Sequence, residues 1–313
     1  MNSVVRYFFL IFLAVLIYGC KRDASEGSLP TEGRMTIYVD KSLAWIMSQQ
    51  KNIFELNYPR AVVDLEYCSE KELFRKFIAD SAGVIVSCRR LSPEEKEYLH
   101  KAQQTHPREY PFAHGAIAFL SSAQAQDSLL TYEQILGLFA GTAQAAGSFA
   151  HILVEDKESG IASDLLARSG AQQPSSSVFA VESKSKILEH LIQNPASMAA
   201  IDWSEWSDSD RSDLKDTLAR LRVIQITRPI DSLQQGYLTP YQYHLTDGMY
   251  PFTRELCLIT RTGKTDLGTG FASFIAGDIG QKIILKAGLY PKFQSDRWIE
   301  FIDSDIKLNR SGN

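Results

Sequence analysis

A unit made of a β-strand, a tight loop and a helix recurs along this chain, and this alternation limits the possible folds more than any other feature. The first copy spans residues 35–58, where a β-branched and aromatic run at residues 36–39 precedes Ser42 and an amphipathic helix. Two more units follow, and Ser-x-x-Glu capping boxes at Ser69 and Ser92 open their helices. Such alternation predicts an α/β fold with a doubly wound, mainly parallel sheet.

The second half of the chain continues this pattern. Strands are predicted at residues 113–122, 149–154, 178–181, 198–202, 221–227 and 256–260, and helices at residues 131–139, 161–168, 185–193, 267–276 and 278–287. A loop is predicted at residues 105–111, and an exposed loop at residues 203–213 contains Trp203 and Trp206. We expect the two tryptophans to anchor this loop, with a partner-binding patch as the alternative.

Polar residues follow several predicted strands at their carboxyl ends, where doubly wound sheets bind their ligands. Ser42 follows the first strand, and Ser87 and Arg89 follow the third. Ser159 and Gly160 open a later helix, whose free backbone N–H groups can hold an anion. The alternative is that Ser42 and Ser159 only mark the starts of helices and that Arg89 forms a surface ion pair.

The first 19 residues are typical of an export signal. A mildly basic start precedes an apolar run at residues 7–18, which is short for a transmembrane helix. The run ends in Leu16-Ile17-Tyr18-Gly19-Cys20, the pattern of a bacterial lipoprotein signal. We therefore predict cleavage before Cys20, acylation of this cysteine (palmitate among the acyl groups) and a flexible tether at residues 20–32. An ordinary secretory signal is the alternative.

These features place the protein in the cell envelope, on the periplasmic side and lipid-anchored to a bacterial membrane. Lys21 differs from the Asp that keeps some lipoproteins at the inner membrane, so the outer membrane is favoured. The net charge of −4 lacks the basic excess of a nucleic-acid binder, so we expect no nucleic-acid partner.

The cysteines and the missing motifs exclude further classes. Cys68, Cys88 and Cys257 cannot all pair and are predicted to be free thiols. The sequence has no Cys/His cluster, no G-x-S-x-G, no H-E-x-x-H and no G-x-G-x-x-G motif. We therefore expect no metal, no cofactor and no enzymatic activity, since reversible binding needs neither a nucleophile nor a general base.

Several blocks resemble, in the same order, the phosphate-binding proteins of bacterial ABC importers: Ile37-Tyr-Val-Asp-Lys-Ser42, Val86-Ser-Cys-Arg-Arg-Leu-Ser-Pro-Glu-Glu95, Tyr132-Glu-Gln-Ile-Leu-Gly-Leu-Phe-Ala-Gly141, Tyr250-Pro-Phe-Thr-Arg254 and Gly280-Gln-Lys-Ile-Ile-Leu-Lys-Ala-Gly-Leu-Tyr-Pro291. This resemblance implies a periplasmic-binding-protein type II fold with two lobes, each a mixed, mainly parallel sheet flanked by helices. Residues 33–113 and 247–313 would form lobe one, and residues 114–246 lobe two. The lobes would close on a ligand by hinge motion, in a protein expected to be a monomer.

The resemblance also implies a function and a set of ligand residues. The protein would capture a small anion, most simply phosphate, for an ABC permease. Ser42, Ser87, Arg89, Ser159 and Gly160 would contact this anion, while Arg254 would act near the hinge.

The chain departs from the family at three positions of the anion site. Glu155 replaces an Arg, Ile161 replaces a Thr, and Gly115 stands where many relatives carry an acid. A carboxylate at residue 155 would repel a dianion, and Lys157 would have to turn inward to compensate. The alternative function is therefore a structural or sensory component of an envelope complex that has kept the fold without phosphate binding.

Overall fold

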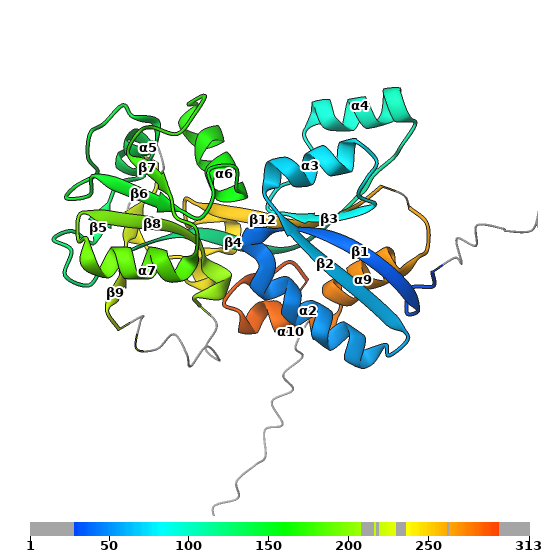
Figure 1. Cartoon of the computed structure of the whole chain (residues 1–313). Coiled ribbons are helices and arrows are strands. Elements are labelled where there is room, and N and C mark those ends of the chain that lie inside the picture. The colour runs from blue at the N-terminus through cyan, green and yellow to red at the C-terminus, as the bar shows by residue number, and fades with distance from the viewer. Residues whose placement is uncertain (1–27, 208–215, 217–218, 230–235, 262, 294–313) are drawn as a thin grey trace, which may run out of the picture.

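A ten-stranded mixed sheet runs through the whole molecule and joins two lobes (Figure 1). The computed structural model describes residues 28–207, 216, 219–229, 236–261 and 263–293. The sheet has the order β2-β1-β3-β12-β4-β8-β6-β7, with β9 and β13 paired to β4. The export signal, Cys20 and most of the tether lie outside the described residues.

The strands and helices occupy the following residues. The large sheet contains β1 (Gly33–Asp40), β2 (Ala61–Cys68), β3 (Val84–Ser87), β4 (Arg108–Ser122), β6 (His151–Val154), β7 (Val178–Ala180), β8 (Ser197–Asp202), β9 (Leu221–Val223), β12 (Thr253–Thr260) and β13 (Tyr290–Pro291), and a small sheet contains β5 (Leu129–Leu130), β10 (Gln225–Thr227) and β11 (Tyr237–Leu238). The helices are α2 (Ala44–Asn57), α3 (Glu70–Ile78), α4 (Pro93–Gln103), α5 (Tyr132–Ala140), α6 (Gly160–Ser169), α7 (Lys184–Gln193), α9 (Leu267–Ala276) and α10 (Asp278–Lys286).

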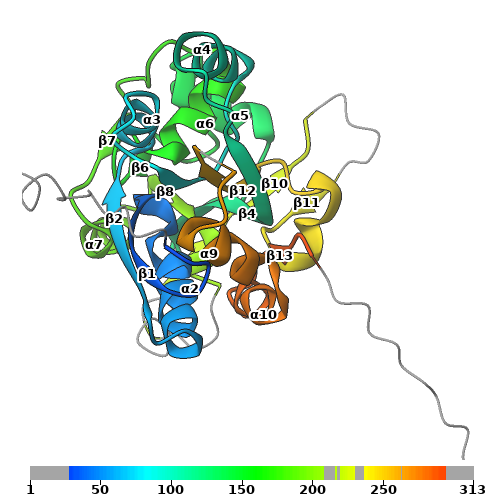
Figure 2. The same cartoon turned by 90° about the vertical axis from the view of Figure 1, so that its right-hand side faces the viewer.

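Two long strands, β4 and β12, pass between the lobes (Figures 1 and 2). Residues 108–116 of β4 pair with β12, whereas residues 117–122 pair with β8 and β9. In one lobe β1 pairs in parallel with β2 and β3, and in the other β6 pairs in parallel with β7 and β8. This is the predicted two-lobed α/β fold, with a mixed sheet in each lobe.

Each lobe has its own hydrophobic core. In the first lobe α2, α9 and α10 cover one face of the sheet, while α3 and α4 cover the other (Figures 1 and 2). A separate core, drawn from residues 116–252, includes Phe119, Phe139 and Phe149. Because the two cores are separate, each lobe can move as a body about the strands that connect them.

Local signals placed most helix starts correctly. Ser92 and Glu95 form the predicted capping box of α4, and Thr131 and Gln134 form another at α5. At α3 the Ser69 side chain accepts a hydrogen bond from the backbone of Glu72. Ser159 caps α6 in the same way, because its Oγ accepts a hydrogen bond from the backbone N–H three residues on.

Three expectations from the sequence were wrong. Residues 108–111 are not loop but the start of β4, where a register shift against β12 accommodates Pro111, which has no N–H to donate. Residues 203–207 are not an exposed loop, because Trp203 and Trp206 pack into the core of the second lobe; this burial confirms that the tryptophans anchor the segment, and residues 208–213 lie outside the described residues. Ser42 is not a cap: Asp40 caps the short 3₁₀ turn Lys41–Leu43, and α2 begins after it.

Candidate functional site

The carboxyl ends of three strands converge on one arginine between the lobes. Asp40 ends β1, Cys88 follows β3, Asp202 ends β8, and Arg254 lies in the crossing strand β12. The Arg254 side chain is 1% exposed, and its Nη2 donates a hydrogen bond to Asp202 Oδ2. Burial by itself would lower the pKa of Arg254, but the nearby acidic groups, Cys88 foremost, outweigh it and raise that pKa. A fixed positive charge therefore stands at the junction of the lobes.

Asp40 is the negative counterpart of this arginine. Its Oδ1 accepts a hydrogen bond from the Ser42 backbone at 2.8 Å, but its Oδ2 has no partner, although the residue is fully buried. Burial raises the pKa of Asp40, while Arg254 and the Ser42 bond oppose the rise. The carboxylate therefore has an unused hydrogen-bond acceptor in a dry position.

Arg254 has two unused donors beside this acceptor. Its Nε and Nη1 are buried and make no hydrogen bond, and Arg254 and Asp40 influence each other's pKa without bonding directly. An unsatisfied buried polar group costs about 1–3 kcal/mol, so natural proteins rarely leave several together without a water or ligand. These three atoms indicate a place where something binds.

The helix α6 brings the second lobe to this place. Ser159 Oγ accepts a hydrogen bond from Ala162 N at 3.3 Å, and so satisfies one of the free N–H groups at the start of the helix. A Cβ atom at Gly160 would lie 2.3 Å from Asp40 Oδ2 and 2.9 Å from Glu70 Oε2. Only glycine lets the two lobes approach this closely.

Glu70 supplies a second carboxylate at the same point. It is the first residue of α3 and is 5% exposed. Burial and the Asp40 carboxylate raise the pKa of Glu70, although Arg89, Arg254 and a hydrogen bond with Ser163 of α6 oppose the rise. Two acids from the first lobe thus face the start of α6 in the second lobe.

The structure brings most of the predicted ligand residues to this cleft. Ser159 and Gly160 lie at the contact just described, and Ser42 Oγ lies 3.7 Å from Cys88 Sγ, one residue beyond Ser87. Ser87 is fully buried, and its Oγ accepts a hydrogen bond from the Arg89 backbone at 3.3 Å. Ligand contact by these residues stays a prediction.

Arg89 is held within the first lobe. Its two terminal nitrogens donate to Glu95 at 2.8 and 2.9 Å, its Nε lies 3.4 Å from Glu70 Oε1, and its guanidinium stacks on the Phe74 ring. An anion would have to compete with Glu95 for this side chain. In this structure Arg89 therefore forms ion pairs, as the alternative prediction stated.

Sequence reasoning missed the acids of the site. Asp40 and Glu70 were not among the predicted ligand residues, although each directly follows a strand or a capping serine, and Arg254 was assigned to the hinge. Gly115 does not face the cleft, because a Cβ there would meet Leu256 and Leu289 in the core. An acid at residue 115 would therefore not reach the ligand position without local rearrangement.

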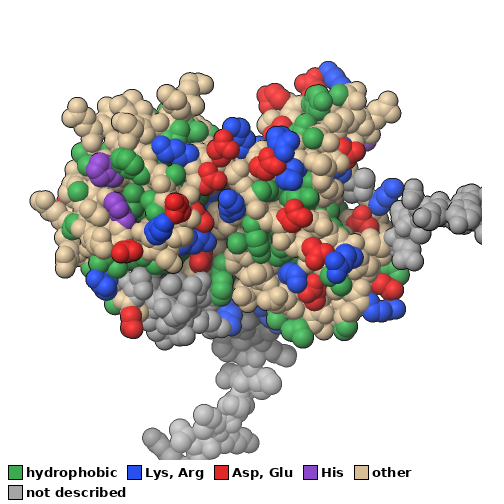
Figure 3. Space-filling model, viewed as in Figure 1, with side chains coloured by type: hydrophobic (Ala, Val, Ile, Leu, Met, Phe, Trp, Pro, Cys, Tyr) green, Lys and Arg blue, Asp and Glu red, His purple; other side chains and the backbone are tan. Residues whose placement is uncertain are grey.

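Charged pairs across the cleft hold the lobes together. Lys71 of α3 lies 2.6 Å from Glu158, and Lys41 lies 3.9 Å from Asp156, both in the loop before α6. Figure 3 shows acidic and basic side chains side by side where the lobes meet. Both pairs are exposed to solvent, which screens the attraction between their charges, so each contributes little to stability.

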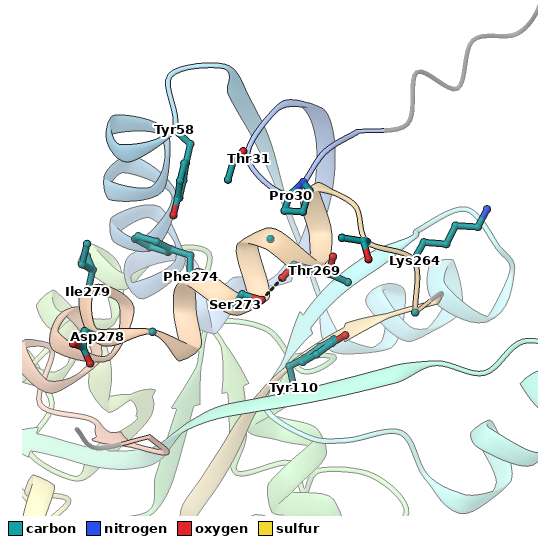
Figure 4. Close-up of a pocket in the computed structure, with 14 residues that line it drawn as sticks. Pro30, Thr31, Tyr58, Tyr110, Lys264, Thr269, Ser273, Phe274, Asp278 and Ile279 are labelled. Atoms are coloured by element: carbon teal, nitrogen blue, oxygen red, sulfur yellow. Dashed lines mark hydrogen bonds between the residues drawn. The ribbon is translucent and has the colours of Figure 1, made fainter. Parts of the chain in front are cut away.

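A separate pocket of about 730 Å³ lies on the outer side of the first lobe (Figure 4). Pro30, Tyr58, Tyr110, Lys264 and Thr269 are among the residues that line it. Pro30 sits against α9 at Gly270, where a Cβ would lie 1.8 Å from the Pro30 carbonyl oxygen. The pocket shares no residue with the cleft, and it marks where residues 28–31, at the end of the predicted tether, pack on the first lobe.

Comparison with known proteins assigns this architecture. A family model described as a PBP superfamily domain matches residues 24–278. The chain belongs to the PBP superfamily. The resemblance seen in the sequence blocks is thereby confirmed at the level of family and fold. A search of curated proteins finds no match.

Several solved structures share this fold at low sequence identity. A substrate-binding protein assigned to a phosphate ABC transporter of Clostridium perfringens, with bound phosphate, is 15% identical, with a TM-score of 0.65 over 83% of this chain and 99% of that one. An ABC-type phosphate transport receptor from Vibrio cholerae is 14% identical, with a TM-score of 0.62 over 83% and 100%. The CcmR regulatory domain of Synechocystis PCC6803, in complex with 2-PG, is 12% identical, with a TM-score of 0.50 over 78% and 96%.

Neither a membrane-spanning helix nor a metal-binding cluster occurs among the described residues. In that part of the chain, no helix combines the length and apolar character that crossing a membrane requires. No group of three or more His, Cys, Asp or Glu side chains could hold a metal ion within the same residues. The three cysteines there are free, and burial raises the pKa of Cys68 to about 11 and that of Cys257 to about 12.

Proposed function

We propose that this protein is an extracytoplasmic solute-binding lipoprotein that captures a small anion, most simply phosphate, between its lobes for an ABC importer. The observation that carries the proposal is the pair of unbonded donors on Arg254, buried where the lobes meet and close to the start of α6. A planar guanidinium with two free N–H donors suits an oxyanion, and a helix N-terminus adds further donors. The ligands named for the phosphate-transport relatives agree with this choice.

The acids of the cleft restrict the form of the anion. A like charge at about 4 Å costs ~4 kcal/mol at an effective dielectric constant near 20. Asp40 and Glu70 therefore disfavour a dianion and favour an anion that brings a proton, since Asp40 Oδ2 can accept one hydrogen bond more. Protonated phosphate fits both requirements.

The remaining parts of the proposal concern the membrane. Acylated Cys20 would anchor the protein on the periplasmic side of the envelope, in the outer membrane rather than the inner, and the permease would be its partner. The tether at residues 20–32 and the lobes at residues 33–113 with 247–313 and at residues 114–246 belong to the same proposal.

Thermal unfolding of the full-length chain in detergent tests anion capture, after refolding has removed any bound ligand. Phosphate at ~100 times its dissociation constant should add about 2.7 kcal/mol to the free energy of unfolding. The stabilisation should vanish in Arg254→Lys, which lacks the planar fork, and persist in the exposed control Arg34→Gln. If neither phosphate nor sulfate stabilises the protein, anion capture is wrong.

A second function is favoured by the contact at Gly160. The lobes meet there through Asp40 and Glu70, and two ion pairs link them at the rim. Such direct contacts between the lobes suit a structural or sensory component of an envelope complex, which needs no solute to join them. Small-angle scattering decides between the two functions, because the capture function requires phosphate to make the refolded protein more compact, whereas the second requires no change.

A further inference from the structure

We propose that the solute in this cleft is a compact zwitterion, whose oxyanion binds Arg254 and whose ammonium group binds Asp40 and Glu70. The proposal rests on the capture function above and names the solute class more narrowly. It begins from the unbonded atoms, since Arg254 offers donors and Asp40 offers an acceptor within one buried site. A solute that satisfies all of them must carry both an acceptor group and a donor group.

The charge balance of the cleft favours a donor with a positive charge. Arg254 is bonded to Asp202, Arg89 to Glu95, and Arg168 to Asp164 at 2.6 Å. Each guanidinium near the cleft therefore already has its own carboxylate.

Two carboxylates remain without a full partner. Among the residues that the structure describes, Asp40 has no ion-pair partner, and Glu70 shares Arg89 with Glu95. Phosphate would add negative charge to this site, whereas the ammonium group of a zwitterion offsets at least one negative charge of its own oxyanion. An ammonium group between the two carboxylates would also supply the partner that Asp40 Oδ2 lacks.

The geometry places these two acids together. Asp40 Oδ2 and Glu70 Oε2 both lie within 3 Å of the point where a Cβ of residue 160 would stand. Gly160 fills this point while the lobes touch, so the ammonium group would bind after the lobes separate, when its three N–H donors could reach both oxygens. The solute must be small, since it takes the place of the Gly160 contact.

A matched pair of solutes tests the proposal. Aminomethylphosphonate and methylphosphonate differ by one ammonium group, and calorimetric titration of the full-length chain in detergent at pH 7 compares their dissociation constants. We expect aminomethylphosphonate to bind about tenfold more tightly or better, as a charged hydrogen bond in a buried site provides. Equal or weaker binding of the amine would overturn the proposal.

Two isosteric variants locate the ammonium group. Asp40→Asn and Glu70→Gln should each reduce the preference for the amine to within about threefold, because a neutral amide no longer attracts the ammonium charge. The exposed control Glu66→Gln removes a carboxylate from β2 and should leave the preference unchanged. Circular dichroism and thermal unfolding would verify that the variants are folded. A preference that persists in both variants also overturns the proposal.

The outcomes separate this inference from the function on which it rests. Binding of methylphosphonate and phosphate without preference for the amine would leave anion capture intact and refute the zwitterion. No binding of either phosphonate or of phosphate would refute both.

Discussion

Gly160 is the residue at which the two lobes come closest, and it owes this position to its missing side chain. A Cβ there would lie 2.3 Å from Asp40 Oδ2, a distance that real atoms do not adopt. The neighbouring Ser159 caps α6, so the backbone cannot easily withdraw. Contact between the lobes therefore requires that residue 160 has no Cβ atom.

Gly160→Ala should open the cleft. We expect the radius of gyration from small-angle scattering to increase, with a loss of stability of about 1–3 kcal/mol, because a group is forced into filled space. Gly83→Ala is the control, since its Cβ would meet nothing within 4 Å. An alanine variant with an unchanged radius would contradict the contact that we describe.

The paired carboxylates predict a particular pH dependence of stability. Burial raises the pKa of both Asp40 and Glu70 in the folded protein, so the folded state binds more protons than the unfolded state. Their stabilisation is therefore complete below the ordinary carboxyl values of about 4 and is lost as the pH rises through the raised values.

Denaturant titrations between pH 4 and pH 8 test this dependence. Other acids oppose it, because the pKa values of Glu55, Glu95 and Glu255 are lowered in the folded protein. The difference in unfolding free energy between wild type and Glu70→Gln isolates the effect of one acid. Relative to the variant, wild type should lose stability as the pH rises. A difference that is constant, or that increases with pH, would show that Glu70 is not held as described.

At the scale of elements, the crossing strand β12 is fixed by a buried ion pair. Asp202→Asn should lower the unfolding free energy by about 3–5 kcal/mol, because it leaves the Arg254 charge buried with no bonded carboxylate. The exposed pair of Arg34 and Asp64 provides the comparison, and Asp64→Asn should change stability by less than about 1 kcal/mol. If both substitutions lower the unfolding free energy equally in chemical denaturation, the buried pair is no more important to stability than the exposed one.

The start of α9 predicts how the N-terminal segment is attached. The Pro30 carbonyl oxygen fills the place of a side chain at Gly270, and Ser28 Oγ accepts a hydrogen bond from Leu267 N at 3.2 Å. Gly270→Ala should therefore detach this segment and accelerate its cleavage in limited proteolysis, while Gly83→Ala should not. Cleavage at the wild-type rate would contradict this attachment.

Local elements could be predicted from the sequence, whereas their long-range partners could not. Ser92 and Glu95 identify the start of α4 because a capping box is complete within four residues. In contrast, nothing near Arg108 or Pro111 shows that β4 begins there, since its partner is β12 more than a hundred residues later. Strand pairing at that separation leaves no local periodicity to detect.

At the scale of the whole molecule, the two-lobed architecture followed from the resemblance rather than from periodicity. The candidate site shows the same division. Ser159 and Gly160 could be predicted from a strand–loop–helix unit, but the meeting of Asp40, Glu70 and Arg254 requires three distant segments to fold together. From the local sequence, Asp40 is only the end of a strand, Glu70 only the start of a helix, and Arg254 only a residue near the hinge.

The attachment of Pro30 to α9 sets how this molecule would move on a membrane. With a lipid at Cys20, seven residues lie between the anchor and Ser28, and the eight steps along the chain span at most about 28 Å at ~3.5 Å per residue. The first lobe, which carries this attachment, would then stay close to the bilayer, and the second lobe would extend farther from it. Encounters with a membrane-embedded partner would occur by lateral diffusion in two dimensions, at a local concentration set by the leash and not by the volume of the compartment.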